Sequence, residues 1–405
     1  MTAVFLNALG ITCALGLGKA EVARNLFDSS APGGLRTTEA LTTGRPLMLG
    51  VAPGFPLPGE DESTSQRPGL DDHPLPLRGR NNALLRSAYQ QIATEVQAAI
   101  AQYGPSRVAV ILGTSTSGIG ESEQALPQKL AQDRWPPQFH YAQQEIGAPS
   151  RFIAAESGAC GPAWTISTAC SSSAKALASG ARLLRAGIVD AVIAGGADSL
   201  CRFTIDGFTA LESVSAGRCN PFSRHRNGIN IGEGAALFLM TREAGPVRLA
   251  GWGETADAHH ISAPEPQGRG AIAAIEQALA RAGIGAAEVD YVNLHGTATP
   301  QNDAMESRAV VATVGTETPV SSTKPLTGHT LGAAGAIEAG LAWISLVDNP
   351  QQQLPPHWWD GAVDPDLPAL AMVAPGQTAA RPLRHILSHS FAFGGSNAVL
   401  LFGAA

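Results

Sequence analysis

The sequence predicts a layered α/β fold, in which two copies of one strand-and-helix unit pack together as an α/β/α/β/α body. Apolar strand-like segments alternate with segments of helical spacing along most of the 405 residues. RVAVILGTSTSG (107–118) has the same form as VDYVNLHGTATP (289–300), a strand that runs into a loop of small residues. The segment 163–187 matches 319–348 in the same way. These repeats predict a duplicated α/β unit.

Composition and charge limit the classes of protein to which the chain can belong. The contents of 44% hydrophobic and 15% charged residues, with 45 glycines, are typical of a compact enzyme with many tight turns. The formal net charge of −7 argues against general nucleic-acid binding. The five cysteines are scattered without a CxxC pair, which disfavours a disulfide framework and favours a reducing, cytoplasmic location. No apolar run is long enough to span a bilayer.

The elements of the first half, residues 1–245, follow from local patterns. VFLNALGITCALG begins without a basic region, so we interpret it as a strand and turn rather than a signal peptide. A short helix is expected at AEVARNLFDSS, and residues 37–80 are so rich in Pro and Gly that they predict an excursion over the surface. NNALLRSAYQQIATEVQAAIAQYG (81–104) predicts one amphipathic helix ended by Gly. Residues 118–150 show no clear pattern. Further strands are expected at VAVIL, AWTI, VDAVIAGGADSL and GAALFLMTR.

The second half, residues 246–405, repeats the alternation. VRLAGWGET predicts a strand, and RGAIAAIEQALARAG predicts a helix ended by Gly283. The segments 289–300 and 319–348 then give a strand and loop, followed by a strand, a loop and a small-residue helix. HILSHSFAFGGSNAVLLFG predicts a closing hairpin. Reactive groups are expected where strand ends from both halves meet.

Cys170 stands at the joint between the strand and the helix of segment 163–187. A thiol in the first turn of a helix faces unsatisfied N–H groups and the positive end of the helix dipole, and both favour the thiolate. The pattern therefore indicates a nucleophile, with room for a substrate left by Ala169 and the serines at 171–173. The alternative is a buried structural cysteine, since unpaired cysteines are often buried.

Polar partners for this cysteine are found at equivalent strand ends of the second half. His295 and His329 each lie in a Gly/Thr loop after a strand-like segment. Lys324 precedes His329 in an apolar loop, where a buried lysine needs an acidic partner, and Glu338 on the following helix is the natural one. No HExxH or His-x3-His spacing supports a metal site, and no GxxxxGKS/T or GxSxG motif supports a nucleotide site or a hydrolase.

Four segments together resemble the signature blocks of the elongating β-ketoacyl-(acyl carrier protein) synthases, in order and in spacing. They are STACSSS, NLHGTATPQND, STKPLTGHTLGAAGAIEA and SFAFGGSNAVLLF. The resemblance implies the thiolase fold, a duplicated five-layer α/β body, in agreement with the internal repeat. It also implies condensation of an acyl chain with a malonyl unit, both carried on the phosphopantetheine of an acyl carrier protein. No metal or other cofactor is expected.

The resemblance also implies roles for individual residues. Cys170 is similar to the cysteine that takes the acyl chain as a thioester. His295 and His329 are similar to the histidines that bind the malonyl carbonyl and assist decarboxylation. The other positions implied are the active-site Lys324, the helix residue Glu338, the pantetheine-binding Thr297 and Thr299, and Phe393, a gate whose N–H forms an oxyanion hole with that of Cys170.

Several positions depart from the family pattern and leave the acyl substrate open. They are the serines at 171–173, Ser223, Asn227, His389 in place of Asn, and Ala392 in place of Gly between two Phe residues. Alanine restricts φ compared with glycine, so gate motion is expected to differ. In the loop after the second strand, Thr116 and Ser117 are expected to tune the acyl pocket. An aryl-polyene or polyketide pathway therefore stands beside fatty-acid elongation.

An acidic carrier protein is the expected partner, and it requires basic residues around the entrance. The candidates are Arg78, Arg80, Arg86, Lys129 and Arg134, with ordinary solvated surface as the alternative. A homodimer is expected, and a heterodimer with a related subunit is the alternative. A non-catalytic chain-length factor is disfavoured because Cys170 is present. A thiolase is disfavoured because no cysteine follows Cys219.

Overall fold

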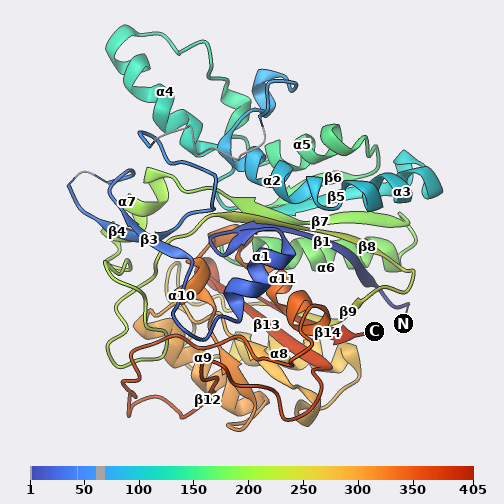
Figure 1. The fold of residues 1–405 in the computed structure, drawn as a ribbon, viewed down its shortest axis with the longest axis vertical. Coiled ribbons are helices and arrows are strands. Elements are labelled where there is room, and N and C mark those ends of the chain that lie inside the picture. The colour runs from blue at the N-terminus through green and yellow to red at the C-terminus, as the bar shows by residue number, and fades with distance from the viewer. Residues whose placement is uncertain (1, 43, 61–68) are drawn as a thin grey trace.

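Five alternating layers of helix and sheet make up the molecule, as the sequence predicts (Figure 1). The computed structural model describes residues 2–42, 44–60 and 69–405. Helices α6 (Ser172–Arg185) and α11 (Ala334–Val347) form the central layer, with strands of the first half on one side and strands of the second half on the other. Further helices cover the outer faces of both sheets.

The strands follow the predicted segments closely in both halves. Those of the first half are β1 (Phe5–Cys13), β2 (Gly16–Leu17), β5 (Val108–Gly113), β6 (Ala163–Ile166), β7 (Ala191–Asp198) and β8 (Gly234–Thr241). Those of the second half are β9 (Val247–Ala256), β10 (Tyr291–Asn293), β11 (Pro319–Ser321), β12 (Ala371–Met372), β13 (His385–Ala392) and β14 (Ser396–Ala404). Strands β5, β7 and β8 are buried along their whole length, which explains their continuous apolar runs.

The two halves share one hydrogen-bonded network of strands. The order is β12-β11-β10-β13-β14-β9-β1-β8-β7-β5-β6, with β2 beside β1. The join between the halves is short, because β1 and β9 pair only at Phe5↔Arg248 and Leu6↔Val247. In each half the parallel pairs lie away from this join, at β5 with β6 and β7, and at β10 with β11 and β13. The strand ends that lead into the site therefore belong to these parallel groups.

Small residues allow α6 and α11 to pack closely in the central layer. A Cβ on Gly335 would lie 2.8 Å from the Cβ of Ala174, so only glycine fits this position. The backbone N–H of Ala336 donates a hydrogen bond to Ser173 Oγ at 2.9 Å, which joins the two helices directly. This contact places the start of α6 beside the loop that precedes α11.

The outer helices differ from the prediction at 81–104, and two of them, at Ala148–Ser157 and Pro300–Thr313, were not predicted. The first half is covered by α2 (Arg80–Gln90), α3 (Ala93–Tyr103) and α5 (Ala148–Ser157), and the second by α8 (Arg269–Ala282) and α9 (Pro300–Thr313). The prediction of a single helix over 81–104 is wrong, because α2 ends at Gln90 and α3 begins at Ala93. The Gln91 side chain hydrogen-bonds the N–H and the carbonyl of Ile11 in β1, both at 3.0 Å, and so serves the sheet rather than the helix.

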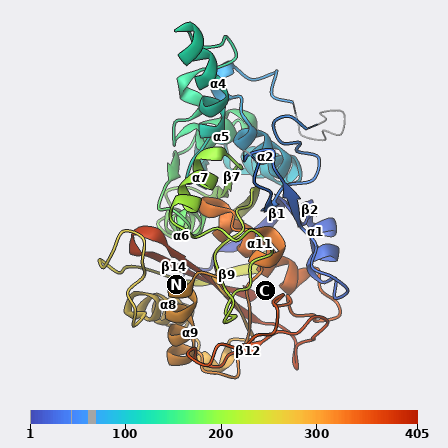
Figure 2. The same cartoon turned by 90° about the vertical axis from the view of Figure 1, so that its left-hand side faces the viewer.

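The Pro/Gly-rich segment at 37–80 contains a hairpin of β3 (Leu35–Thr38) and β4 (Leu47–Gly50), separate from the main sheet. Part of this segment, at 43 and 61–68, lies outside the described residues. The segment 118–150, which shows no clear pattern in the sequence, contains α4 (Ile119–Gln132), and this helix protrudes from the body of the molecule (Figure 2). The remaining helices are α1 (Lys19–Leu26), α7 (Arg202–Ala210) and α10 (Lys324–Thr327).

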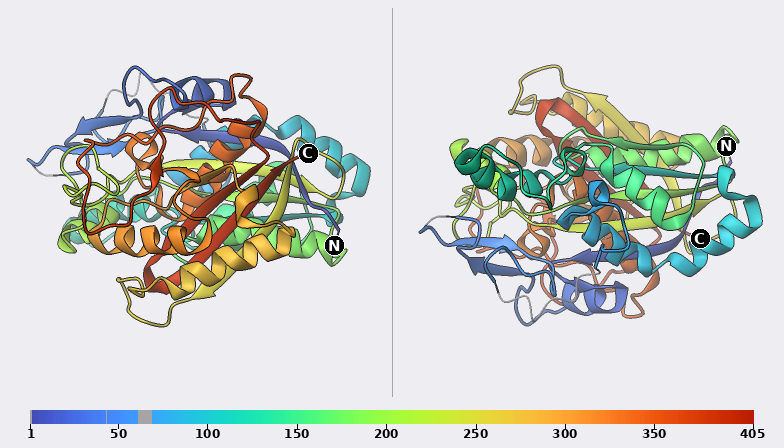
Figure 3. Two further views of the ribbon diagram at one scale, coloured as in Figure 1. Left: turned by 90° about the horizontal axis from the view of Figure 1, so that it is seen from below. Right: turned by 90° about the horizontal axis from the view of Figure 1, so that it is seen from above.

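Both chain ends lie on the same side of the molecule (Figure 3). Within the described residues, every helix is too short or too polar to cross a membrane.

Candidate active site

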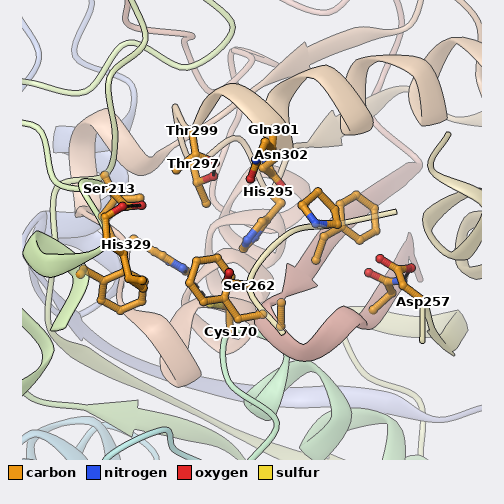
Figure 4. A pocket seen from close by; sticks show the side chains of 18 residues that line it. Cys170, Ser213, Asp257, Ser262, His295, Thr297, Thr299, Gln301, Asn302 and His329 are labelled. Atoms are coloured by element: carbon orange, nitrogen blue, oxygen red, sulfur yellow. Dashed lines mark hydrogen bonds between the residues drawn. The ribbon is translucent and has the colours of Figure 1, made fainter. Parts of the chain in front are cut away.

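Loops from both halves of the chain meet around Cys170 (Figure 4). Cys170 lies between β6 and α6, and His295 follows β10. His329 follows α10, and Phe393 follows β13. All four residues line one pocket, so the structure brings together the nucleophile, the histidines and the gate that the sequence singled out.

Cys170 is a buried thiol in a tight turn. Ala169 before it has φ +51°, and α6 begins only at Ser172. Burial raises the pKa of the Cys170 thiol to about 12, although the charge of Lys324 and the backbone N–H of Phe393 act to lower it. The expectation of a thiolate favoured by the helix N-terminus is therefore wrong, because desolvation outweighs the helix. Cys170 is protonated until a base takes its proton.

The nearest base is His329, whose Nε2 lies 3.0 Å from Cys170 Sγ. The rings of His295 and His329 meet edge to face, with centroids 5.3 Å apart. Burial, reinforced by the charge of Lys324, lowers the pKa of both histidines well below the ordinary value. Both imidazoles are therefore neutral near pH 7. Their Nδ1 atoms have no hydrogen-bond partner among the described residues, which leaves Nε2 as the working atom.

The predicted pair of Lys324 and Glu338 is present. Lys324 Nζ lies 2.5 Å from Glu338 Oε1, and the two side chains are only 1% and 3% exposed. Burial raises the pKa of Glu338 to about 7, while Lys324 acts to lower it. Neither residue lines the Cys170 pocket, and the positive charge of Lys324 acts on both histidines by lowering their pKa.

The predicted threonines and gate lie on the pocket wall (Figure 4). Thr297 and Thr299 share a hydrogen bond between their hydroxyls at 3.0 Å. Ala392 has φ −98° and ψ 155°, an extended conformation that any residue adopts. An altered motion of the gate at Ala392 therefore stays a prediction. The turn after Phe393 is made by Gly394, at φ +78°.

Two buried carboxylates that the sequence reasoning missed organise the surrounding loops. Asp198, at the end of β7, accepts hydrogen bonds from the hydroxyls of Thr114 and Ser115 and from the backbone N–H of Gly332. Burial raises the pKa of Asp198. Glu306 on α9 accepts the backbone N–H groups of the His295 loop. The sequence offered one signal for each of these carboxylates. Asp198 is an acidic residue at the end of an apolar strand, and Glu306 is an acidic residue among the buried positions of a helix.

The serines after Cys170 are structural. Ser172 Oγ donates to the Ala169 carbonyl at 2.6 Å, and Ser173 Oγ accepts the N–H of Ala336. All three serines are fully buried and lie outside the pocket lining, so the expectation that they leave room for a substrate is wrong. Their hydroxyls hold the turn that precedes α6 and join α6 to α11.

A second, more apolar hollow opens beside Cys170. Phe203, Phe208, Leu331 and Phe393 line it, together with Thr116. Thr116 is thus placed where it can contact an acyl chain. Ser117 is not, because its hydroxyl donates to the Glu145 carbonyl at 2.9 Å.

The basic residues proposed for a carrier do not form a ring at the entrance. Arg80 is held in a nearly buried ion pair with Glu233, at 2.6 Å, so its assignment to a surface patch is wrong. Arg86 pairs with Asp72 and Glu156, and only 15% of its side chain is exposed. Both residues hold surface loops against α2.

The other three basic residues keep accessible positions away from the pocket lining. Arg78 donates to the His73 carbonyl at 2.8 Å, and its side chain is 39% exposed. Lys129 on α4 pairs with Asp133, and Arg134 follows on the exposed end of this helix. Contact with a carrier stays a prediction for these three.

The sulfur and imidazole nitrogens of Cys170, His295 and His329 lie within 4.8 Å of one another. Sequence spacing disfavoured a metal site, yet the fold brings these residues together. Their donor set matches the N/S preference of zinc. The absence of a resident metal therefore stays an expectation.

Comparison with known proteins identifies relatives of both halves. The model of the beta-ketoacyl synthase N-terminal domain matches residues 83–245, and that of the C-terminal domain matches residues 247–357. A Synechocystis protein named 3-oxoacyl-(acyl-carrier-protein) synthase 2 is 32% identical over 335 residues, covering 78% of this chain and 79% of its own. A Staphylococcus aureus protein of the same name is 34% identical over 267 residues, which are 62% of this chain and 65% of that protein.

Solved structures extend the likeness to the whole chain. A structure of a ketosynthase in complex with its chain length factor, from Xenorhabdus doucetiae, matches with a TM-score of 0.91 and 44% identity, covering 100% of this chain and 98% of that one. The ishigamide ketosynthase/chain length factor matches with a TM-score of 0.83 and 26% identity, covering 100% and 99%.

Proposed function

We propose that this chain, which belongs to the β-ketoacyl synthase family, condenses a cysteine-bound acyl chain with a malonyl thioester, with loss of CO2. The observation that carries the proposal is the 3.0 Å contact between Cys170 Sγ and His329 Nε2, with His295 beside it in the same pocket. A nucleophile with a base and a second N–H donor fits a two-stage acyl transfer.

In the first stage the Cys170 sulfur attacks the carbonyl carbon of an acyl thioester. His329 Nε2 takes the thiol proton as the new S–C bond forms. The N–H groups of Cys170 and Phe393 stabilise the oxyanion, since both already hydrogen-bond the Cys170 sulfur. When the old S–C bond breaks, the proton passes to the departing pantetheine thiolate. The stage exchanges one thioester for another.

In the second stage a malonyl thioester occupies the pocket. Its carbonyl oxygen accepts N–H groups from Nε2 of both His295 and His329, which requires the other tautomer of His329. The carboxylate leaves as CO2, and its bonding electrons form an enolate. The enolate carbon attacks the Cys170 thioester and expels the thiolate, which takes one proton from solvent. The neutral histidines suit this step because they donate N–H groups without protonating the enolate.

We propose acyl carrier protein as the donor of both thioesters, with no metal or other cofactor. Thr297 and Thr299 line the approach to Cys170 and offer hydroxyls to the amides of a pantetheine arm. Beside the pocket, a second hollow that shares Pro264 and Gln301 with it is lined by the cationic Arg308. Such a group suits an anionic phosphate or an acidic carrier surface.

A second subunit is also part of the proposal, and a chain-length factor is the favoured one. The supporting observation is the 44% identity to a chain from a ketosynthase–chain length factor complex. Strand β6 is an open edge of the sheet within the described structure, and its residue Trp164 is 38% exposed. Such an edge is suited to pairing with another subunit. Pairing with a chain-length factor favours an aryl-polyene or polyketide pathway, beside fatty-acid elongation.

The test follows the two stages separately, with EDTA in the buffer so that the metal-free reaction is measured. Cys170→Ala should abolish the acyl adduct seen by intact mass after incubation with acyl carrier protein. Cys160→Ala, which removes an exposed cysteine, is the matched control and should acylate normally. An adduct on the Cys170 variant would refute the nucleophile.

His295→Ala should leave Cys170 acylation possible while slowing malonyl decarboxylation by about 100-fold or more, as for loss of one preorganised donor to a developing oxyanion. Unchanged CO2 release would remove His295 from the mechanism. Carriers loaded with saturated, unsaturated and aryl chains then identify the pathway, since only accepted chains leave an adduct on Cys170.

A further inference from the structure

His389 is a buried polar residue behind the pocket, on the strand that leads to Phe393. Its side chain is fully buried, and it does not line the Cys170 pocket. We propose that His389 is a positioning residue, which holds His295 in place for the malonyl stage by orienting Glu306. The inference rests on the proposed function, because it assigns His389 to one of the two stages.

One carboxylate collects N–H groups from two segments distant in the sequence. Glu306 Oε1 accepts the backbone N–H of His295, and Oε2 accepts that of Gly296, both at 2.7 Å. His389 Nδ1 lies 3.0 Å from the same Oε1, and Glu306 is fully buried. Both oxygens already accept N–H groups, so His389 Nδ1 is the donor in this contact. The imidazole therefore fixes the oxygen that holds the His295 backbone.

The His295 loop is held from the opposite side by Ser322. Its hydroxyl donates to the Gly296 carbonyl at 2.7 Å. Gly296 has φ +38°, and a Cβ there would lie 2.5 Å from the Cβ of Ser322, so this loop has little freedom on that side. Movement of His295 thus depends on the Glu306 side, where the carboxylate is also contacted by His389 from β13, at 3.0 Å, and by the side-chain amide of Asn302 in α9, at 3.4 Å.

A second route joins the same residues through aromatic rings. The rings of His389 and Phe391 have centroids 5.1 Å apart, and those of Phe391 and His295 are 6.2 Å apart. His389 therefore acts on His295 either through its Nδ1 proton or through its ring. The geometry favours the proton, because a direct hydrogen bond to the carboxylate is more directional than ring packing.

Two substitutions separate the routes. His389→Asn keeps an N–H donor at the position of Nδ1 and removes the ring. His389→Phe keeps a ring beside Phe391 and removes the donor. If the proton carries the effect, His389→Phe should lower kcat for malonyl decarboxylation by about 10- to 100-fold, the range for a lost hydrogen bond to a charged group. KM and Cys170 acylation should change by less than about threefold, and His389→Asn should stay within about threefold throughout.

Hydrogen exchange provides a readout that is independent of catalysis. In His389→Phe the backbone amides of His295 and Gly296 should exchange faster, with the rest of β10 and α9 unchanged. If His389→Phe does not fold, His389→Leu takes its place, because it removes both the donor and the ring, whereas His389→Asn removes only the ring.

Two results would overturn the proposal: equal loss in His389→Asn and His389→Phe, or unchanged decarboxylation in His389→Phe. Failure of the proposed function is recognised separately. In that case the unmodified chain itself neither forms an acyl adduct nor releases CO2 from a malonyl carrier.

Discussion

At the scale of single residues, burial sets the charge of the site. It keeps Cys170 protonated and the two histidines neutral, and Lys324 supplies a positive charge behind them. In the proposed reaction, neutral histidines donate N–H groups to the developing enolate without protonating it. The types and positions of these residues were predictable from the sequence, because each follows a strand-like segment. Their charge states were not, since desolvation depends on what the rest of the chain packs around them.

A buried histidine outside the pocket makes stability depend on pH. His357 Nδ1 accepts the N–H of Ser322 at 3.1 Å, and its Nε2 donates to the Pro221 carbonyl at 3.0 Å. Burial lowers the pKa of His357 from 6.5 to about 4. Below pH 6.5 the unfolded chain takes up a proton that the folded chain refuses, so stability falls as the pH falls towards 4.

The contribution of His357 that is lost by pH 5 should be about 2 kcal/mol. Urea unfolding at pH 7.5 and pH 5.0 measures it. His357→Gln should flatten the pH dependence by about this amount, and His260→Gln, at an exposed site, should leave it unchanged. Equal curves for all three proteins would contradict the assignment.

At the scale of elements, the contact between α6 and α11 sets the geometry of the site. Cys170 precedes one helix and His329 precedes the other, so their separation depends on how closely the helices approach. Most strands of the main sheet and the helices α6, α8 and α11 were predictable from periodicity. Helix α9 was not predicted, and neither was the break at Gln91, because its cause is a side-chain contact with a strand 80 residues away. Helix α4 was missed because it contains Pro127 and buries only Ala125.

Gly335→Ala should force the two central helices apart. The new Cβ would meet Ala174 at 2.8 Å, which predicts a loss of about 1–3 kcal/mol of stability and slower acylation of Cys170. Gly120→Ala in α4 is the control, because its Cβ finds only an ordinary contact, 3.6 Å from Cys201. Thermal unfolding and the intact-mass rate are the measurements. A Gly335 variant as stable as the control would show that the central layer is not tightly packed.

At the scale of the whole molecule, internal duplication explains why a site can form between distant segments. The duplication was visible in the sequence, because the paired segments 107–118 and 289–300 share one pattern. The acyl chain was not predictable, since the hollow beside Cys170 is bounded by Phe203 and Leu331 from separate parts of the fold. The partner subunit was not predictable for a similar reason. The sequence alone does not show which strand lies at the edge of the sheet, and the strand order of the folded chain places β6 there.

Trp164→Glu tests the proposed pairing at β6. A charge on this open edge should weaken association with a second subunit by at least about tenfold, measured by mass photometry over a dilution series. Ile188→Glu, at an apolar side chain that is 52% exposed outside β6, is the matched control. Association that is weakened equally by both changes, or by neither, would place the interface elsewhere.

The distance along the chain between Cys170 and His329 has a consequence during biosynthesis. The two residues are 159 positions apart, and ribosomes add about 5–20 residues per second, so the sulfur is made on the order of 10–30 s before its base. Strand β1 is likewise made long before β8, with which it forms its longest antiparallel pairing. A nascent chain thus carries the cysteine before it carries the imidazole that lies 3.0 Å from its sulfur in the folded protein. Under the proposed function, the cysteine gains its base only after His329 has been made and the second half has folded against the first.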